Sequence, residues 1–302
     1  MTFIELHSKT VTYIPELDVL NLRTRFVSFC LFCSILLICL FTTQSFAYET
    51  VKFESSKSTK SKKVLLRGNL FVPSGKGPFP AVVLMHGCGG WQTAVHTALS
   101  NYATFLTNNG FAVLNLDSFG PRRNSGGEVC ASYEKLRDAR KYRTVDAFDA
   151  IHYLKKLNFI DSNNIFLMGQ SNGGSVAINI ANSSRTKTGY RAVVAYYPWC
   201  GAFGSNKVKL TLPLLVLGGE QDNWVPPQPC KKVVSIGEEL RVTIFPKAVH
   251  SFDIDIIPQR YMGKLIGYDE NAARNSRIAM LSFFNQHLTL DARNNIRNIA
   301  QN

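Results

Sequence analysis

The sequence predicts an α/β fold with a mainly parallel central sheet covered by helices on both faces. Short apolar runs alternate with longer segments of helical character along most of the chain, and this alternation builds βαβ units. The apolar runs are continuous, as expected for strands buried on both faces. No internal repeat, low-complexity stretch or linker interrupts the pattern. One domain is therefore expected.

The predicted elements follow from local signals along the chain. Two half-buried strands precede the repeating pattern, and the first long helix has an Asn-Gly stop signal at 109–110. A long Gly-, Arg- and Ser-rich loop separates the second buried strand from the second helix. The polar tail after Asp291 is expected to be frayed. The expected strands are 51–53, 64–72, 81–85, 112–116, 165–168, 192–197, 214–217 and 241–245, and the expected helices are 94–108, 136–157, 172–180 and a last one ending near 288.

Composition fits an ordinary globular core and gives no sign of a nucleic-acid-binding protein. The 302 residues are 45% hydrophobic and 18% charged, with a formal net charge of +13. The basic residues are scattered, and the sequence contains neither a basic stripe nor a known reading module. We therefore expect no nucleic-acid partner. A solvated basic surface explains the charge, and attraction to anionic substrates or to an anionic envelope surface is the alternative.

Residues 1–47 are predicted to be a secretory signal peptide that is removed, which leaves a catalytic domain at 48–302. Arg23 and Arg25 precede an apolar run at 26–41, and Ser45 and Ala47 supply small residues at a cleavage site. A membrane anchor is the alternative, although a span usually needs about 20 apolar residues. The expected location is periplasmic or secreted, with no stable membrane span after cleavage.

Four cysteines remain after such a cleavage, and an even number in an exported chain favours disulfides. Cys88 and Cys130 lie in loops that follow two consecutive strands. Cys200 and Cys230 follow two later strands, at one rim of the sheet. The predicted bridges are therefore Cys88–Cys130 and Cys200–Cys230.

Residues 169–173 read Gly-Gln-Ser-Asn-Gly and follow a buried strand. The Gly-x-Ser-x-Gly pattern between a strand and a helix is typical of a nucleophile elbow, a sharp turn whose glycines leave room for a crowded backbone. Ser171 is therefore the candidate nucleophile.

A serine nucleophile needs a base and a carboxylate, which this architecture delivers in the order Ser, Asp or Glu, His. Only His250 and His287 follow Ser171; His287 lies in the last helix, whereas His250 lies in a loop after a strand. Asp222 follows the strand at 214–217 and is preferred to Glu220, which lies nearer the strand end. The predicted triad is Ser171, Asp222 and His250.

The developing oxyanion needs two backbone N–H donors. One is expected from Asn172, directly after the nucleophile, and the other from the glycine-rich loop at 86–90. Cys88 is the first choice in that loop and Gly89 the second. His86 is expected to brace the loop.

Aromatic residues and one arginine are candidates for the substrate pocket. Every tryptophan follows a strand end, where it either caps the core or forms a pocket wall. Arg122 is either a solvated loop residue or a guanidinium that binds a substrate carboxylate, in which case acidic esters are preferred. The candidates are Trp91, Phe119, Arg122, Trp199 and Trp224, with Phe252 as a further wall residue.

Six segments together resemble the dienelactone hydrolase family of α/β-hydrolases. They are His-Gly-Cys-Gly-Gly at 86–90, Asp-Ser-Phe-Gly-Pro-Arg at 117–122, Gly-Gln-Ser-Asn-Gly-Gly at 169–174, Tyr-Pro-Trp-Cys at 197–200, Gly-Gly-Glu-Gln-Asp-Asn-Trp at 218–224 and His-Ser-Phe-Asp at 250–253. The resemblance implies an α/β-hydrolase fold and the same triad. The enzymes that gave the family its name look to use an elbow cysteine, so Ser171 favours a general serine esterase over a dienelactone hydrolase proper.

The sequence thus predicts an exported serine hydrolase that cleaves small carboxylic esters or lactones through an acyl-enzyme, with no cofactor and no metal. A serine peptidase of the prolyl-oligopeptidase type shares the elbow and the triad order, but no propeller or other large recognition domain precedes the hydrolase part. A non-catalytic binding protein on a hydrolase fold is the remaining alternative, and it usually lacks a triad member.

Overall fold

The computed structural model describes residues 48–57, 63–124, 127–183 and 189–299, which belong to one compact unit. The predicted signal peptide at 1–47 lies outside these residues. Within the described residues, no helix combines the length and apolar character needed to cross a membrane.

An eight-stranded sheet forms the centre of this unit, in the order β1-β2-β4-β3-β5-β6-β8-β10. β1 and β2 pair antiparallel, as do β2 and β4, and every other neighbouring pair is parallel. The mainly parallel sheet predicted from the sequence is therefore present. The strands are β1 (Tyr48–Glu54), β2 (Leu65–Phe71), β3 (Phe79–Met85), β4 (Ala112–Asp117), β5 (Ile160–Gln170), β6 (Val193–Tyr196), β8 (Leu214–Gly219) and β10 (Leu240–Phe245).

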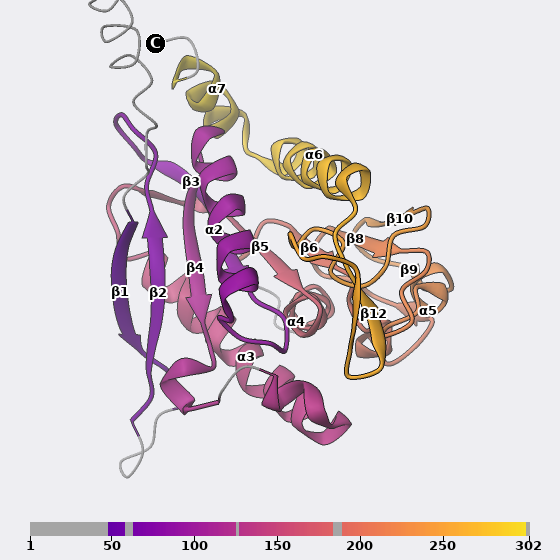
Figure 1. Ribbon diagram of the computed structural model, residues 1–302. Coiled ribbons are helices and arrows are strands. Elements are labelled where there is room, and N and C mark those ends of the chain that lie inside the picture. The colour runs from indigo at the N-terminus through magenta and orange to yellow at the C-terminus, as the bar shows by residue number, and fades with distance from the viewer. Residues whose placement is uncertain (1–47, 58–62, 125–126, 184–188, 300–302) are drawn as a thin grey trace, which may run out of the picture. The chain divides into compact units, whose positions relative to one another are not determined.

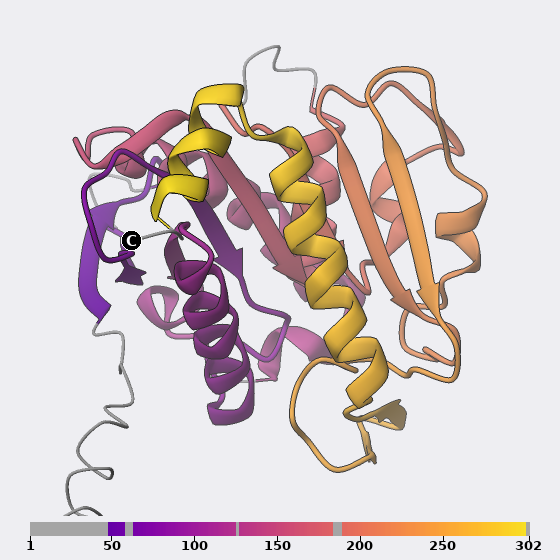
Figure 2. The ribbon, with the colours of Figure 1, turned by 90° about the horizontal axis from the view of Figure 1, so that it is seen from above.

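Helices cover both faces of the sheet. Figure 2 shows α2 (Thr93–Asn108), α6 (Glu270–His287) and α7 (Leu290–Ile299) together in front of the strands. α3 (Tyr133–Leu154) and α4 (Asn172–Ala181) pack on the opposite face. Each face has its own apolar core, and all residues of β3 are buried between the two. Burying one large apolar side chain stabilises the fold by about 1.5–3 kcal/mol, so this sandwich holds the strand ends in place.

Short elements occupy the loops around the strands. A two-stranded hairpin of β11 (Gln259–Tyr261) and β12 (Lys264–Ile266) follows the last sheet strand, and Figure 1 shows β12 beside the β8 end of the sheet. β7 and β9 form a separate parallel pair. The remaining short elements are η1 (Gly120–Arg122), η2 (Glu128–Ala131), η3 (Cys200–Phe203), β7 (Lys207–Val208), α5 (Gln228–Lys231) and β9 (Val234–Ser235).

Two helix boundaries differ from the sequence prediction. α3 begins at Tyr133, earlier than expected, because the Ser132 side chain accepts a hydrogen bond from the Lys135 N–H and caps the helix. The expectation that the tail after Asp291 is frayed is wrong, since α7 continues to Ile299. The Thr289 N–H donates to the Asn164 side chain, and Ala292 is buried against the sheet core, so tertiary contacts stabilise this polar helix.

Candidate active site

Ser171 lies at the turn between β5 and α4, with φ 51° and ψ −112°. This is a backbone conformation that residues other than glycine rarely adopt, and it is stored strain of the kind found at functional sites. A Cβ on Gly169 would collide with the Gly173 carbonyl, and one on Gly173 would collide with the Met85 carbonyl. Both glycines of the sequence pattern are therefore required by close backbone contacts, and the turn presents the Ser171 side chain outward.

Asp222 and His250 are aligned with Ser171 in one hydrogen-bonded chain. The His250 Nε2 lies 3.1 Å from the Ser171 Oγ, and its Nδ1 lies 2.7 Å from the Asp222 Oδ2. The other carboxylate oxygen, Oδ1, accepts the N–H groups of Trp224 and Val225 at 2.8 and 2.9 Å. Asp222 and His250 are 4% and 3% exposed. An imidazole held in this way can take a proton from the hydroxyl, and the carboxylate fixes its tautomer.

The loop after β3 runs directly beside Ser171. A Cβ on Gly87 would lie 3.4 Å from the Ser171 Cβ, and the Gly90 N–H closes the loop onto the Gly87 carbonyl. Within the described part of the chain, the backbone N–H groups of Cys88 and Asn172 donate no hydrogen bond. Two unused donors therefore flank Ser171 on the side where an oxyanion hole is expected.

Arg143 of α3 connects the two sides of this candidate oxyanion hole. It is fully buried, and its guanidinium donates to the Asn172 Oδ1 at 2.7 Å and to the His86 carbonyl oxygen. The Asn172 Nδ2 in turn donates to the Leu136 carbonyl at 3.0 Å. Burial lowers the pKa of Arg143 to about 10, so it remains a cation at neutral pH. The sequence reasoning missed this residue, because nothing in its local pattern distinguishes it from a solvated helix arginine.

His86 braces the same loop from inside the core. Its Nδ1 lies 2.7 Å from the Gly87 carbonyl, and its Nε2 accepts the Ser118 N–H at 3.3 Å. Burial, followed by the positive charge of Arg143, holds its pKa well below the ordinary value of 6.5. His86 is therefore neutral at neutral pH.

Two disulfides join the loops at this end of the sheet. Cys88 bonds to Cys130 and Cys200 bonds to Cys230, with Cα–Cα distances of 5.2 Å in both bridges. These are the two pairs expected from the sequence. The first bridge holds the loop after β3 against η2, next to Ser171.

A buried polar network supports the His250 loop. The Tyr197 ring contacts the His250 imidazole edge-on at 4.6 Å, and the Tyr197 hydroxyl donates to the Asp253 Oδ1 at 2.6 Å. The Asp253 Oδ2 accepts the Tyr102 hydroxyl at 2.9 Å and the Gln170 Nε2 at 2.7 Å. Burial raises the pKa of Asp253. The network connects the loop to β5, to the residue that follows β6 and to α2, which limits the movement of His250.

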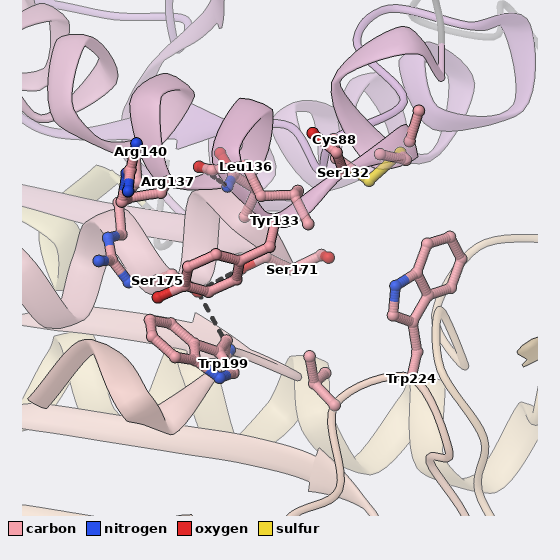
Figure 3. Close-up of a pocket in the computed structure, with 14 residues that line it drawn as sticks. Cys88, Ser132, Tyr133, Leu136, Arg137, Arg140, Ser171, Ser175, Trp199 and Trp224 are labelled. Carbon is pink, nitrogen blue, oxygen red and sulfur yellow. Dashed lines mark hydrogen bonds between the residues drawn. A yellow bond between two sulfur atoms is a disulfide. The ribbon is translucent and has the colours of Figure 1, made fainter.

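Two cavities meet at Ser171. The first, called here the α3 cavity, has a volume of about 350 Å³ and is bounded by α3, Trp199 and Trp224. Figure 3 shows the Tyr133 ring between Ser171 and the arginines of α3, with the Trp199 ring next to Tyr133. The second, the hairpin cavity, has a volume of about 250 Å³ and lies between His250, the β11–β12 hairpin and the loop after β3. Cys88 and Trp224 border both cavities.

Trp199 and Trp224 line a cavity at Ser171, whereas several other candidates for the pocket wall do not. Trp91 borders neither cavity and packs against His96, under the Arg67 guanidinium. Phe119 is 1% exposed and contacts His86 edge-on at 4.6 Å. Phe252 is likewise fully buried in the core. Strand-end position alone does not separate a core aromatic from a pocket aromatic.

The expectation that Arg122 binds a substrate carboxylate is wrong for this structure. Its guanidinium makes a bidentate ion pair with Asp146 of α3, at 2.7 and 2.9 Å, and donates to the Ser118 carbonyl. Its side chain is 10% exposed and borders neither cavity. The partner carboxylate on a distant helix could not be identified from the loop sequence. Among the described residues, the arginines that border the α3 cavity are Arg137 and Arg140.

Comparisons with known proteins agree with this fold. The family model described as "Dienelactone hydrolase family" matches residues 66–288. A dienelactone hydrolase-like promiscuous phosphotriesterase, P91, from metagenomic libraries superposes with a TM-score of 0.62 at 21% identity, covering 80% of this chain and 100% of that one. Thermogutta terrifontis esterase 2, in a structure phosphoramylated by tabun, superposes with a TM-score of 0.54 at 17% identity, covering 81% and 96%. At these identities the two structures support the α/β-hydrolase fold alone.

A curated human protein matches part of the chain. Acyl-coenzyme A thioesterase 1 of Homo sapiens is 30% identical over 118 residues, which are 39% of this chain and 24% of the thioesterase. The chain thus matches about a quarter of that relative's length.

Proposed function

Because the chain belongs to the dienelactone hydrolase family, we propose that it is a serine hydrolase that cleaves carboxylic esters or lactones through an acyl-enzyme. The observation that carries the proposal is the hydrogen-bonded chain from Asp222 through His250 to Ser171. Ser171 is the proposed nucleophile, His250 the general base and then acid, and Asp222 the carboxylate that orients the imidazole.

The proposed reaction has an acylation step and a deacylation step. The Ser171 Oγ attacks the ester carbonyl carbon while the His250 Nε2 takes the hydroxyl proton. The tetrahedral intermediate collapses, the bond to the leaving oxygen breaks, and His250 returns the proton to that oxygen. Water then attacks the acyl-enzyme by the same route, with His250 as base. For a lactone, the leaving oxygen remains joined to the acyl group through the opened ring, and deacylation releases a single hydroxy acid.

The backbone N–H groups of Cys88 and Asn172 are the proposed oxyanion donors. Both are free within the described residues and lie beside Ser171. Loss of one such donor typically removes about 3–4 kcal/mol of transition-state stabilisation. Arg143 holds the Asn172 side chain and the carbonyl of His86, so we propose that it positions both donors.

Thioesters are a second candidate substrate class. The partial match to a human acyl-coenzyme A thioesterase favours them, although it covers only 39% of this chain. A thioester presents the same acyl carbonyl to Ser171, and only the leaving atom differs. The two cavities at Ser171 provide room for a group on each side of either bond.

Export is part of the proposal. The two disulfides support an oxidising compartment, because such bridges are rare in proteins kept reduced in the cytosol. The expected removal of residues 1–47 and a periplasmic or secreted location therefore remain proposals. Amino-terminal sequencing of the protein recovered from its native host tests the cleavage after Ala47.

A panel of chromogenic esters of increasing acyl length, assayed beside an acyl thioester and aminoacyl anilides, tests the function. The wild type should hydrolyse esters, and Ser171→Ala and His250→Gln should each lower kcat on the order of 10⁴-fold or more. Circular dichroism of both variants verifies that the fold is retained. Preferred cleavage of the anilides would favour the peptidase, and ester hydrolysis that survives Ser171→Ala would contradict the proposal.

A further inference from the structure

The two cavities beside Ser171 differ in charge. Arg137 and Arg140 border the α3 cavity, and no described residue in its lining is acidic. The described lining of the hairpin cavity contains no Lys, Arg, Asp or Glu and consists mainly of apolar, aromatic and amide side chains. A substrate that fills both cavities therefore meets positive charge on one side of its ester bond only.

Of the two arginines that border the α3 cavity, Arg140 is the one available to bind an anionic group of a substrate. Arg137 pairs with Asp138 at 3.3 Å, whereas the Arg140 guanidinium has no carboxylate partner within the described residues. It lies over the Trp199 ring at 4.8 Å, and Trp199 contacts Tyr133 edge-on. Partial burial lowers the pKa of Arg140 from its usual value, but it remains a cation at neutral pH. A stacked guanidinium keeps its N–H edge free for a planar anion.

The catalytic geometry assigns the two cavities to the two halves of the ester. His250 must return its proton to the leaving oxygen, so the leaving group lies on the His250 side. His250 borders the hairpin cavity and is absent from the lining of the α3 cavity. Asn172, one of the proposed oxyanion donors, borders the α3 cavity. The acyl group therefore extends toward α3, and the alcohol extends toward the hairpin.

From this arrangement we infer that the preferred substrates are esters whose acyl part carries a carboxylate at its far end, bound by Arg140 against Trp199, with an uncharged alcohol in the hairpin cavity. The inference rests on the proposed ester hydrolysis. It assigns the binding of acidic substrates to Arg140 of α3. Arg122, the candidate from the sequence, is paired with Asp146. Arg140 is a specificity residue, since it contacts the substrate away from the reacting atoms.

Two pairs of esters test the inference on the protein that comprises residues 48–302. The first pair is mono(para-nitrophenyl) adipate and para-nitrophenyl hexanoate, which differ by a carboxylate at the end of the acyl chain. The second pair is para-carboxyphenyl hexanoate and phenyl hexanoate, which differ by a carboxylate on the alcohol. In the first pair the wild type should prefer the acid by about tenfold in kcat/KM, the usual size of one charge-assisted contact. In the second pair it should show no preference for the acid.

Variants of α3 separate Arg140 from the general positive charge of the protein. Arg140→Gln should lower the adipate-to-hexanoate ratio about tenfold, and Arg140→Lys should retain part of it. Lys141→Gln is the matched control, because Lys141 is an exposed cation on the same helix outside both cavities, and its ratio should equal that of the wild type. The wild-type preference should also weaken between about 20 mM and 500 mM NaCl.

Three results would overturn the inference. They are a wild-type ratio of one or less in the first pair, an unchanged ratio in Arg140→Gln, and a preference for the acid in the second pair only. Failure of the proposed function gives a different result, since neither member of either pair is then hydrolysed above the rate of Ser171→Ala.

Discussion

The fully buried guanidinium of Arg143 donates a 2.7 Å hydrogen bond to the side-chain oxygen of Asn172, the residue that follows the proposed nucleophile Ser171. The same guanidinium donates to the carbonyl of His86, which precedes the loop that contains Cys88. One cation on α3 therefore holds both backbone segments whose N–H groups face the proposed oxyanion. The link joins three separate parts of the sequence through a single side chain.

Arg143→Met should lower kcat for ester hydrolysis by about 10–100-fold and change KM by less than about twofold, because the donors act mainly in the transition state. Arg143→Lys should recover part of kcat, since an ammonium can still donate to one of the two oxygens. Steady-state kinetics of both variants, with thermal unfolding measured in parallel, test this. Loss of stability with an unchanged kcat would show that Arg143 supports the fold and does not position the donors.

Breaking the Cys88–Cys130 bridge should affect turnover more than breaking the Cys200–Cys230 bridge. Both bridges close loops of similar length, 42 and 30 residues apart in sequence, so chain entropy predicts about 4 kcal/mol of stabilisation from each. Only the first bridge holds a proposed oxyanion residue. Cys130→Ala should lower kcat about tenfold, a fraction of the 10²–10³-fold effect of losing a donor. Cys230→Ala is the control, and equal effects of the two changes on kcat would contradict the prediction.

His86 should make the folded protein less stable as the pH falls below 6.5. Burial and the charge of Arg143 keep the folded pKa well below that value, so in this range the unfolded chain binds a proton that the folded protein does not. The contribution of His86 to the free energy of unfolding is fully present above the pKa that this residue has in the unfolded chain. It falls by up to about 1.4 kcal/mol per pH unit as the pH drops toward the pKa of His86 in the folded protein. Urea denaturation at several pH values measures the slope.

His86→Gln should flatten this pH dependence, whatever its effect on stability at pH 8. His152→Gln is the control, because His152 is exposed on α3 and should leave the slope as it is in the wild type. A slope that is the same in all three proteins would mean that His86 is not the group that titrates.

The parts of the fold and site that depend on strand ends could be predicted from the sequence. Ser171, Asp222 and His250 each follow an apolar strand, and parallel strands deliver their carboxyl ends to one edge of the sheet. The order of elements follows from the same apolar runs. These features are local in sequence, so a linear pattern is sufficient to identify them.

Features that depend on contacts between distant segments could not be predicted in this way. Arg122 and Arg143 are both arginines near the predicted site. Arg122 forms an ion pair with Asp146, whereas Arg143 donates a hydrogen bond to Asn172 in the elbow. The polar helix α7 is stabilised at its start by Asn164, which lies 125 residues before its hydrogen-bond partner Thr289. The hairpin at 259–266 contains no strong strand signal, and its Leu265 N–H bonds to the Asn223 side chain. Tertiary packing decides each of these cases.

Mass spectrometry after reaction with a fluorophosphonate tests the central claim, the assignment of Ser171 as an activated nucleophile, most directly. The account predicts one added phosphonyl group per chain, located by peptide mapping on Ser171, with no labelling in Ser171→Ala and strongly slowed labelling in His250→Gln. Modification of another residue, or equal labelling of Ser171→Ala and the wild type, would contradict it.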